Sequence, residues 1–382
     1  MDRSAGCFIC FSPCMLPSLL YNAYNIVESK VLNVPYWSEE VLSEAEEKQA
    51  QVIFNLLKEA TSQTVVREFL REKDIAITAP NWDELYSNRI LPALQSKKLS
   101  LVDLATLLQD VEEHGRQHIF LYKCSPADAR AILNKMRIHS IAKDLGVAEL
   151  LSHPLHIEMP EEAKIVDIRL PEAPNGTGPV SLTVKISECR ETSKLVNDDY
   201  DPVTSSRTKT YKVTKKRAIN IATLTLDGLL EIRIASRDNS TKYHEQVSDV
   251  IRMASKFFPM DSFEILSLSK AKDTLFLKKE EFEGIIRYSS TTARNDYGIA
   301  MNLAASNLSQ NLSEDDGSSA AMKEFLAQKG FVTGSNIWFI INGEEERQIH
   351  VLLNGEINEF AVTAACTPGE YSYVCGQILS LN

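Results

Sequence analysis

Several motifs that identify common enzyme classes are missing from this sequence. There is no glycine-rich phosphate-binding loop of either common kind and no Gly-x-Ser-x-Gly elbow that would present a nucleophilic serine. His156-x-Glu158 matches half of a zinc-deaminase motif, but the Pro-Cys-x-x-Cys half is absent. His114 and His118 lie four residues apart, and Gly115 interrupts the helix that would place them on one face. We therefore expect neither a catalytic residue nor a cofactor.

Long apolar runs are also missing. No stretch of 18 or more apolar residues occurs, so we expect no membrane-spanning helix. The segment Ser4–Leu20 is apolar, but it contains two prolines and lacks a convincing small-residue cleavage site. A signal peptide is therefore weakly supported, and we expect residues 1–37 to form an apolar arm that is buried or covered by a partner. A misassigned start codon and a membrane anchor at Phe8–Leu20 are the alternatives.

Cysteine is infrequent, with seven in 382 residues. Cys7, Cys10 and Cys14 have the most metal-like spacing, but a tetrahedral site needs four ligands and no second paired motif completes it. We interpret them as structural or incidental thiols, and their role stays open. The other four are scattered singly, as is typical of small buried thiols: Cys124, Cys189, Cys366 and Cys375. This usage fits a reducing compartment, and we expect a cytoplasmic protein.

The overall composition is that of an acidic globular protein. The apolar content of 44% and the charged content of 24% are ordinary. A length of 382 residues allows two or three hydrophobic cores. The formal net charge of −11 excludes a general nucleic-acid coat, because an acidic surface repels phosphate. Any nucleic-acid binding has to be local.

Residues 38–153 have the pattern of a helical domain. Ser38 can cap the first helix, and Pro92 predicts a kink or break in a later one. Gly115 predicts the end of a helix. The apolar run at residues 117–122 has strand composition, so this helical third contains at most one short strand.

Residues 160–258 predict an antiparallel α+β domain. Its strand-like runs, separated by turn signals, are Ile165–Leu170, Val180–Ile186, Thr208–Thr214, Ile219–Leu226 and Leu229–Ala235. Asp227-Gly228 lies between the last two runs and predicts a tight hairpin. The apolar spacing across Tyr243–Phe258 predicts a helix that covers the sheet.

Residues 259–382 predict a third, β-rich module. Its expected strands are Phe263–Leu268, Thr274–Leu277, Gly284–Tyr288, Ile337–Ile341, Gln348–Leu353, Phe360–Ala364 and Tyr373–Ile378. A polar segment at residues 307–319 predicts a mobile loop, and a short helix is expected at residues 320–329. The fold class expected for the whole chain is α+β, with a helical bundle, an antiparallel sheet and this β-rich module in that order.

Clustered carboxylates offer an alternative, enzymatic reading. The two clusters are Asp198, Asp199 and Asp201, and Glu314, Asp315 and Asp316. Such clusters in loops are usually solvated, although they can bind a divalent cation. Asp227 followed by Glu231 and Arg233 is a weak nuclease pattern, because arginine stands where lysine is expected. A metal-dependent hydrolase or nuclease is therefore the alternative function.

Positive charge is concentrated in one stretch, Arg207–Arg217. This stretch holds six cations and no carboxylate within eleven residues. Its Tyr, Val and Thr content favours a strand, and lysine is common on exposed sheet edges. One interpretation is a solvated hairpin that pairs with the nearby aspartates; the other is a contact surface for nucleic acid or an acidic partner. The residues of that candidate surface are Arg207, Lys209, Tyr211, Lys212, Lys215, Lys216 and Arg217.

The order of elements resembles that of a known family. A helical module ends in Leu101–Leu108 and is followed by Glu112-Glu-His-Gly-Arg-Gln-His-Ile-Phe-Leu-Tyr122. A β-rich platform and a helix ending in Arg252-Met-Ala-Ser-Lys-Phe-Phe258 come next. Over about residues 65–258 this order is similar to the eukaryotic centromere protein N family, in which a helical death-fold-like domain precedes a curved sheet with a helix across it. The resemblance implies a non-catalytic kinetochore adaptor in the nucleus, with DNA contacts at the basic stretch.

These observations together predict a non-catalytic interaction or adaptor protein. We expect it to be a subunit of a larger complex that docks DNA or an acidic partner through the basic hairpin. Protein partners are expected, nucleic acid is an open option, and membrane association is not expected. The sequence does not predict the oligomeric state.

Overall fold

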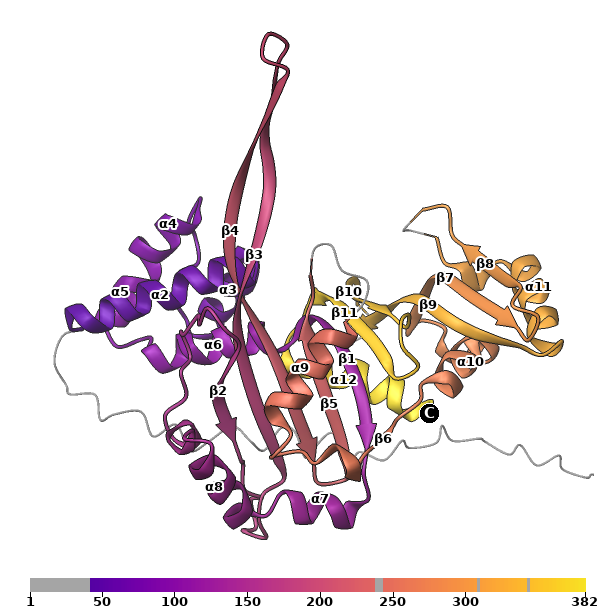
Figure 1. Cartoon of the computed structure of the whole chain (residues 1–382), viewed down its shortest axis with the longest axis horizontal. Helices are drawn as coiled ribbons and strands as arrows, with labels where there is room; N and C mark the ends of the chain where they lie inside the picture. Colours follow the sequence, from indigo (N-terminus) through magenta and orange to yellow (C-terminus); the bar gives the residue numbers. More distant parts are fainter. Residues whose placement is uncertain (1–41, 238–242, 308–309, 342–343) are drawn as a thin grey trace, which may run out of the picture.

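The described residues form a helical domain beside one large antiparallel sheet (Figure 1). The computed structural model describes residues 42–237, 243–307, 310–341 and 344–382. The predicted α+β fold class is confirmed. The apolar arm expected at residues 1–37, with its three cysteines, lies outside the described residues.

Helices α2 to α6 make up the helical domain. Their bounds are α2 (Glu44–Ala60), α3 (Gln63–Glu72), α4 (Trp82–Leu85), a π-helical turn (Tyr86–Ile90), α5 (Leu91–Gln95) and α6 (Leu101–Glu113). Helix α2 begins after Ser43, which forms a capping box with Glu46, whereas the predicted cap Ser38 is outside the described residues. The break predicted at Pro92 is the π-helical turn that precedes it, where the wider turn accommodates a residue without an N–H.

Eleven strands in the described part of the chain pair in a single sheet. Its order is β2-β3-β4-β5-β1-β11-β10-β9-β7-β8, with β6 beside β1. The bounds are β1 (Gly115–Lys123), β2 (Lys164–Arg169), β3 (Ser181–Asp201), β4 (Ser206–Thr225), β5 (Leu229–Ala235), β6 (Glu264–Ile265), β7 (Ile286–Asn295), β8 (Ala300–Ala304), β9 (Gly330–Ile341), β10 (Glu344–Leu352) and β11 (Glu359–Ala365). Strand β1 pairs with β5 on one side and with β11 on the other, so the two β regions predicted separately are continuous.

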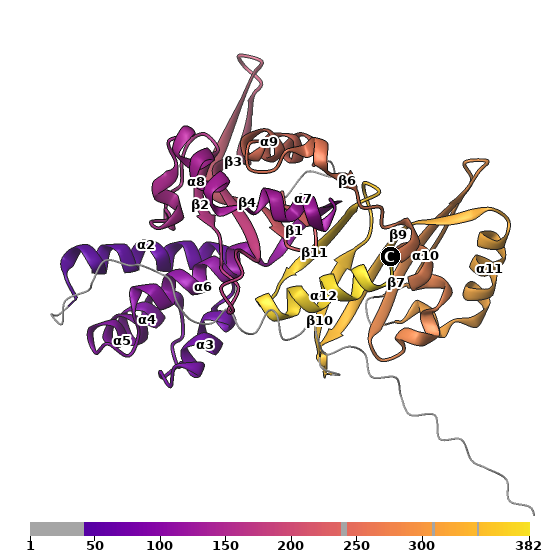
Figure 2. The same ribbon diagram turned by 90° about the horizontal axis from the view of Figure 1, so that it is seen from below.

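The two halves of the sheet are covered by helices on opposite faces (Figure 2). The first half packs against α7 (Pro126–Ile132), α8 (Lys135–Asp144) and α9 (His244–Ala254). The second half packs against α10 (Ser269–Leu277), α11 (Asp316–Ala327) and α12 (Pro368–Ser380). Strand β1 serves both cores because successive side chains point to opposite faces: Phe120 joins the first core, and Ile119 and Leu121 join the second.

Two of the strands predicted within residues 259–382 are wrong, because both segments are helical. Thr274–Leu277 lies in α10, and Tyr373–Ile378 lies in α12. Helix α12 starts with a capping box between Thr367 and Glu370, and its buried residues Val374 and Ile378 are four apart. The predicted loop at residues 307–319 is also shorter than expected, since α11 begins within it.

Gly228 forms the predicted hairpin between β4 and β5. Its φ is +91°, and a Cβ added there would lie 2.2 Å from the carbonyl oxygen of Cys124. Cys124 also donates its backbone N–H to the carbonyl oxygen of Gly228 at 2.9 Å. The hairpin turn is therefore held against the end of β1 at a spacing that only glycine permits.

We expect Gly228→Ala to lower the free energy of unfolding by at least about 2 kcal/mol, because it combines left-handed strain with a backbone clash. Gly146→Ala is the matched control, since Gly146 has a φ of +70° and nothing within 4 Å of an added Cβ. Urea denaturation measures the free energy of unfolding of both variants. If both variants lost the same free energy of unfolding, the contact with Cys124 would not contribute to the effect of Gly228→Ala.

Candidate interaction arm

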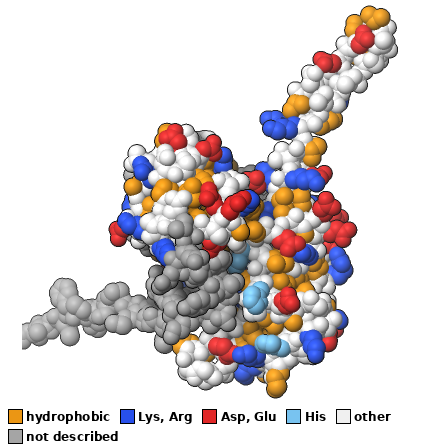
Figure 3. Space-filling model, turned by 90° about the vertical axis from the view of Figure 1, so that its left-hand side faces the viewer, with side chains coloured by type: hydrophobic (Ala, Val, Ile, Leu, Met, Phe, Trp, Pro, Cys, Tyr) orange, Lys and Arg blue, Asp and Glu red, His pale blue; other side chains and the backbone are white. Residues whose placement is uncertain are grey.

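Strands β3 and β4 continue beyond the sheet as a two-stranded arm, residues 191–216 (Figures 1 and 3). Their inner parts are buried in the sheet, whereas every residue from 191 to 216 is exposed. At about 3.4 Å per residue, the exposed strands extend about 35 Å. The predicted strands Thr208–Thr214 and Ile219–Leu226 are thus parts of one strand, of which only the second is in the sheet.

The register of the arm sorts its side chains onto two faces. Residues directly opposite in an antiparallel pair share a face, and a bulge at Val196 shifts the register between Leu195 and Asn197. The tyrosine face comprises Glu191, Ser193, Leu195, Asp198, Tyr200, Arg207, Lys209, Tyr211, Val213 and Lys215. The lysine face comprises Thr192, Lys194, Asn197, Asp199, Asp201, Ser206, Thr208, Thr210, Lys212, Thr214 and Lys216.

Two ion pairs on the tyrosine face enclose exposed apolar side chains. Arg207 donates from Nε and Nη2 to the two carboxylate oxygens of Asp198 at 2.7 and 2.6 Å, and these bonds raise the pKa of Arg207. Lys215 Nζ lies 3.1 Å from Glu191 Oε1. The expected pairing of the basic stretch with a nearby aspartate is confirmed for Arg207. Between the two pairs, Tyr211 is 51% exposed with apolar neighbours.

The lysine face places two like charges directly opposite each other. Lys194 of β3 pairs in register with Lys212 of β4, and no described residue forms an ion pair or hydrogen bond with either ammonium group. Directly opposite like charges destabilise a strand pair. The surrounding side chains are hydroxyl groups, as at Thr192 and Thr214, so this face is suited to contact an anionic group.

Arg217 is at the root of the arm and is not part of its exposed surface. Its side chain is 2% exposed, and Nη1 lies 2.6 Å from Glu112 Oε1 while Nε donates to Ser187 Oγ at 3.2 Å. Burial lowers the pKa of Arg217, and Glu112 acts in the opposite direction. The other six residues predicted as a contact surface, from Arg207 to Lys216, lie on the exposed arm.

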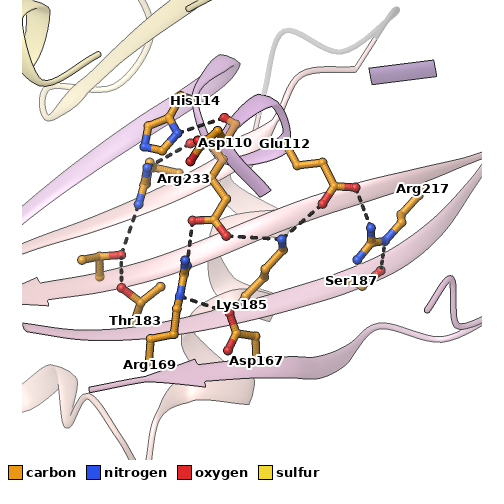
Figure 4. Close-up of polar contacts among 12 residues, drawn as sticks. Asp110, Glu112, His114, Asp167, Arg169, Thr183, Lys185, Ser187, Arg217 and Arg233 are labelled. Atoms are coloured by element: carbon orange, nitrogen blue, oxygen red, sulfur yellow. Dashed lines mark hydrogen bonds and ion pairs between the residues drawn. The ribbon is translucent and has the colours of Figure 1, made fainter. Parts of the chain in front are cut away.

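A buried network of charged side chains lies at the root of the arm, between α6 and the sheet (Figure 4). Glu112 and Glu113, at the end of α6, face cations from three strands. Lys185 Nζ is 3.2 Å from an oxygen of each glutamate, and Arg169 Nη2 is 2.7 Å from Glu113 Oε2. Arg217 is the third cation, and its Nη1 lies 2.6 Å from Glu112 Oε1. These cations offset the cost of two carboxylates at the negative end of the helix dipole.

Further contacts close the network toward α12. Arg233 Nη1 donates to the carbonyl oxygen of Glu113 at 2.9 Å, and its guanidinium lies 5.1 Å from the ring centroid of Tyr371. Burial acts to raise the pKa of Glu113, but Arg169 and Lys185 hold it well below its ordinary value. The carboxylates and cations form ion pairs with one another, although Arg217 Nη2 and Asp167 Oδ1 have no hydrogen-bond partner among the described residues. We interpret the network as a clamp between the helical domain and the sheet.

None of the sequence motifs described above indicates the clamp. The available signal is the consecutive pair Glu112 and Glu113 in the last turn of a helix, where cations are usually favoured. A second signal is Lys185 within the apolar run Val180–Ile186. The pairing of these residues depends on contacts between α6 and β3, which are far apart in the sequence.

The carboxylates of the alternative, metal-dependent reading have protein partners. Asp201 accepts hydrogen bonds within the turn at the tip of the arm, Asp227 Oδ2 lies 3.1 Å from Lys123 Nζ, and Glu231 accepts from the hydroxyl of Tyr371. Within the described ranges, no group of three or more His, Cys, Asp or Glu side chains could hold a metal ion. The geometry therefore gives that reading no support.

Comparison with known proteins does not assign this chain to a family. No protein-family model matches the chain, and no curated protein is significantly similar to it. None of the helices in the described residues is long and apolar enough to cross a membrane.

Proposed function

We propose that this chain is a non-catalytic interaction protein, a subunit of a larger complex, which docks a protein partner through the arm. The observation that carries the proposal is the projection of residues 191–216 from the sheet with exposed apolar and cationic side chains. Strand β2 pairs only with the inner part of β3, and β5 only with the inner part of β4. An isolated two-stranded ribbon is marginally stable, and its open edges favour pairing with another chain.

The side chains of the arm favour an acidic protein over duplex DNA as its partner. The lysine face offers Lys194 and Lys212 to carboxylates, and the tyrosine face offers Tyr211 and Val213 to apolar groups. The arm also carries Glu191 and three aspartates, which repel phosphate. Mixed aromatic and cationic chemistry is typical of protein interfaces. DNA binding, implied by the resemblance to the centromere protein N family, is the second candidate.

A photo-crosslinking amino acid at Tyr211 would capture the partner in cells, for identification by mass spectrometry. We expect Lys194→Glu with Lys212→Glu to weaken the affinity for that partner about tenfold or more, because the substitutions repel an acidic surface. The matched control is Lys98→Glu with Lys143→Glu, which changes the net charge equally at exposed sites outside the arm.

A shortened arm provides the decisive variant. Thr192 and Thr214 are paired in register, so a two-residue Asn-Gly turn can join them without disturbing the inner sheet. We expect an unchanged urea midpoint and no binding of the crosslinked partner. Full affinity in this variant would contradict the proposal, and a shift of labelled duplex DNA by the native chain alone would favour the second candidate.

A further inference from the structure

A second exposed surface lies on the half of the sheet away from the arm. Strand β9 alternates between buried residues, such as Ile337 and Phe339, and solvent-accessible ones, such as Trp338. The buried set packs with α10 and α12, so the accessible set lies on the opposite face of the sheet. We call this surface the open face; its principal residues are Arg287, Arg294, Phe331, Asn336, Trp338 and His350.

A row of stacked planar groups crosses the open face. In register, Arg287 of β7 is opposite Trp338 of β9, which is opposite His350 of β10. The Arg287 guanidinium lies 5.0 Å from the Trp338 ring centroid, and the His350 ring lies 4.4 Å from it at 32°. Farther along the same two strands, Arg294 is opposite Phe331 in register, and Phe331 is 43% exposed.

Polar contacts hold this row in position. His350 bonds through Nδ1 to Thr363 Oγ1 at 2.6 Å and through Nε2 to Asn336 Oδ1. Gln348 Oε1 accepts from Nε and Nη2 of Arg287 at 3.1 and 2.8 Å. Burial, with Arg287, lowers the pKa of His350, so its ring is neutral at pH 7. The planar groups are therefore fixed before any ligand arrives.

The charge of the open face is opposite to that of the chain. Among the outward positions of β7, β9 and β10 whose side chains the structure describes, none is a carboxylate. The outward carboxylate of β11, Glu359, is buried and lies 2.6 Å from His118 Nδ1. The formal net charge of the whole chain is −11. A face with two arginines, the exposed ring of Phe331 and the amides of Asn336 and Gln348 is suited to an anionic ligand that has planar groups.

We propose that the open face binds single-stranded nucleic acid. A base stacks on the exposed ring of Phe331, and neighbouring phosphates contact Arg294 and Arg287. Stacking requires unpaired bases, since a duplex hides the flat faces of its bases, and every base provides such a face. This site is separate from the arm, so it does not depend on the partner of the arm.

Fluorescence anisotropy of labelled oligo(dT), of about 12 nucleotides, tests the proposal on the full chain at low ionic strength. We expect measurable binding that weakens as salt is raised. Phe331→Ala should weaken the affinity about tenfold, because it removes the stacking ring. Trp338→Ala should also weaken it, because the indole holds the Arg287 guanidinium in position. Phe331 is exposed, so its replacement keeps the test valid if Trp338→Ala does not fold. The matched control is Tyr200→Ala, which removes an exposed ring from the arm.

Three outcomes would overturn the inference. The first is no binding of oligo(dT) at low ionic strength by the folded native chain. The second is equal affinity in Phe331→Ala and the native chain. The third is equal affinity for a duplex of the same length, which would show attraction by charge alone. Lys194→Glu with Lys212→Glu leaves oligo(dT) binding unchanged if the sites are separate, so failure here and failure of the proposed function are distinguishable.

Discussion

Replacing Glu113 with alanine is expected to destabilise the protein by about 3 kcal/mol, because it removes a carboxylate that two cations share in the buried network. The Glu113 side chain is 4% exposed, and its carboxylate faces Arg169 at 2.7 Å and Lys185 at 3.2 Å. Among the described residues, Lys185 would keep only Glu112, and Arg169 would keep only Asp167. The loss would therefore include the cost of two cations that each have one carboxylate fewer and would exceed the net contribution of the original pairs.

Urea denaturation measures this loss, with Glu59→Ala as the control. Glu59 is exposed on α2 and makes no described contact, so its replacement should change the free energy of unfolding by less than about 0.5 kcal/mol. A double-mutant cycle of Glu113→Ala and Arg169→Ala should give a coupling energy of about 1 kcal/mol or more. Strict additivity would show that the two side chains do not act together and would contradict the clamp.

The stability of the protein is expected to fall steeply as the pH drops from 6.5 to 4. Burial lowers the pKa of His114 to about 4, with a further contribution from Arg233. Burial, with Lys185, lowers the pKa of His156 to about 4 as well. In the unfolded chain both rings bind a proton near pH 6.5, so between these values the unfolded state holds more protons and stability decreases with falling pH.

The expected loss at pH 5 is about 2 kcal/mol for each histidine. When the pH falls below the ordinary pKa of a glutamate, Glu113 adds to the loss of stability. Its pKa is lowered in the folded state, so its carboxylate stabilises that state only while it is charged. Asp167, whose pKa is raised by burial, acts in the opposite direction. Urea midpoints at pH 7 and pH 5 measure the net effect. A variant with His114→Gln and His156→Gln should lose much less, and an equal loss would assign the pH dependence to other groups.

Local signals in the sequence predict the local structure well. Asp227-Gly228 predicts the hairpin between β4 and β5, and the apolar spacing over Tyr243–Phe258 predicts α9. Such features depend on residues close together in the chain. The helical signal of α12 is also present, as a capping box before an apolar run, but the aromatic and β-branched residues there favoured a strand. Competing local preferences were decided by packing against the second core.

Long-range pairing is what the sequence does not show. The apolar run at residues 117–122 indicates a strand, but nothing near it identifies β5 and β11 as its neighbours. The arm is similar, because its basic stretch indicates a strand without showing that β3 and β4 leave the sheet together. The open face depends on register across four strands that are separated by helices and turns. These arrangements follow from the complementarity of buried faces.

The central place of β1 has a consequence for how the chain folds during synthesis. β1 starts at Gly115, which pairs with Ala365, so the ribosome must make the strands between them before this pairing can form. Until β11 emerges, most of β1 has one unpaired backbone edge beside an apolar surface. Contacts between residues that are so far apart in the sequence slow folding and leave intermediates prone to aggregation. A chain interrupted before residue 359 would retain that edge permanently, because β11 supplies the strand that pairs with it.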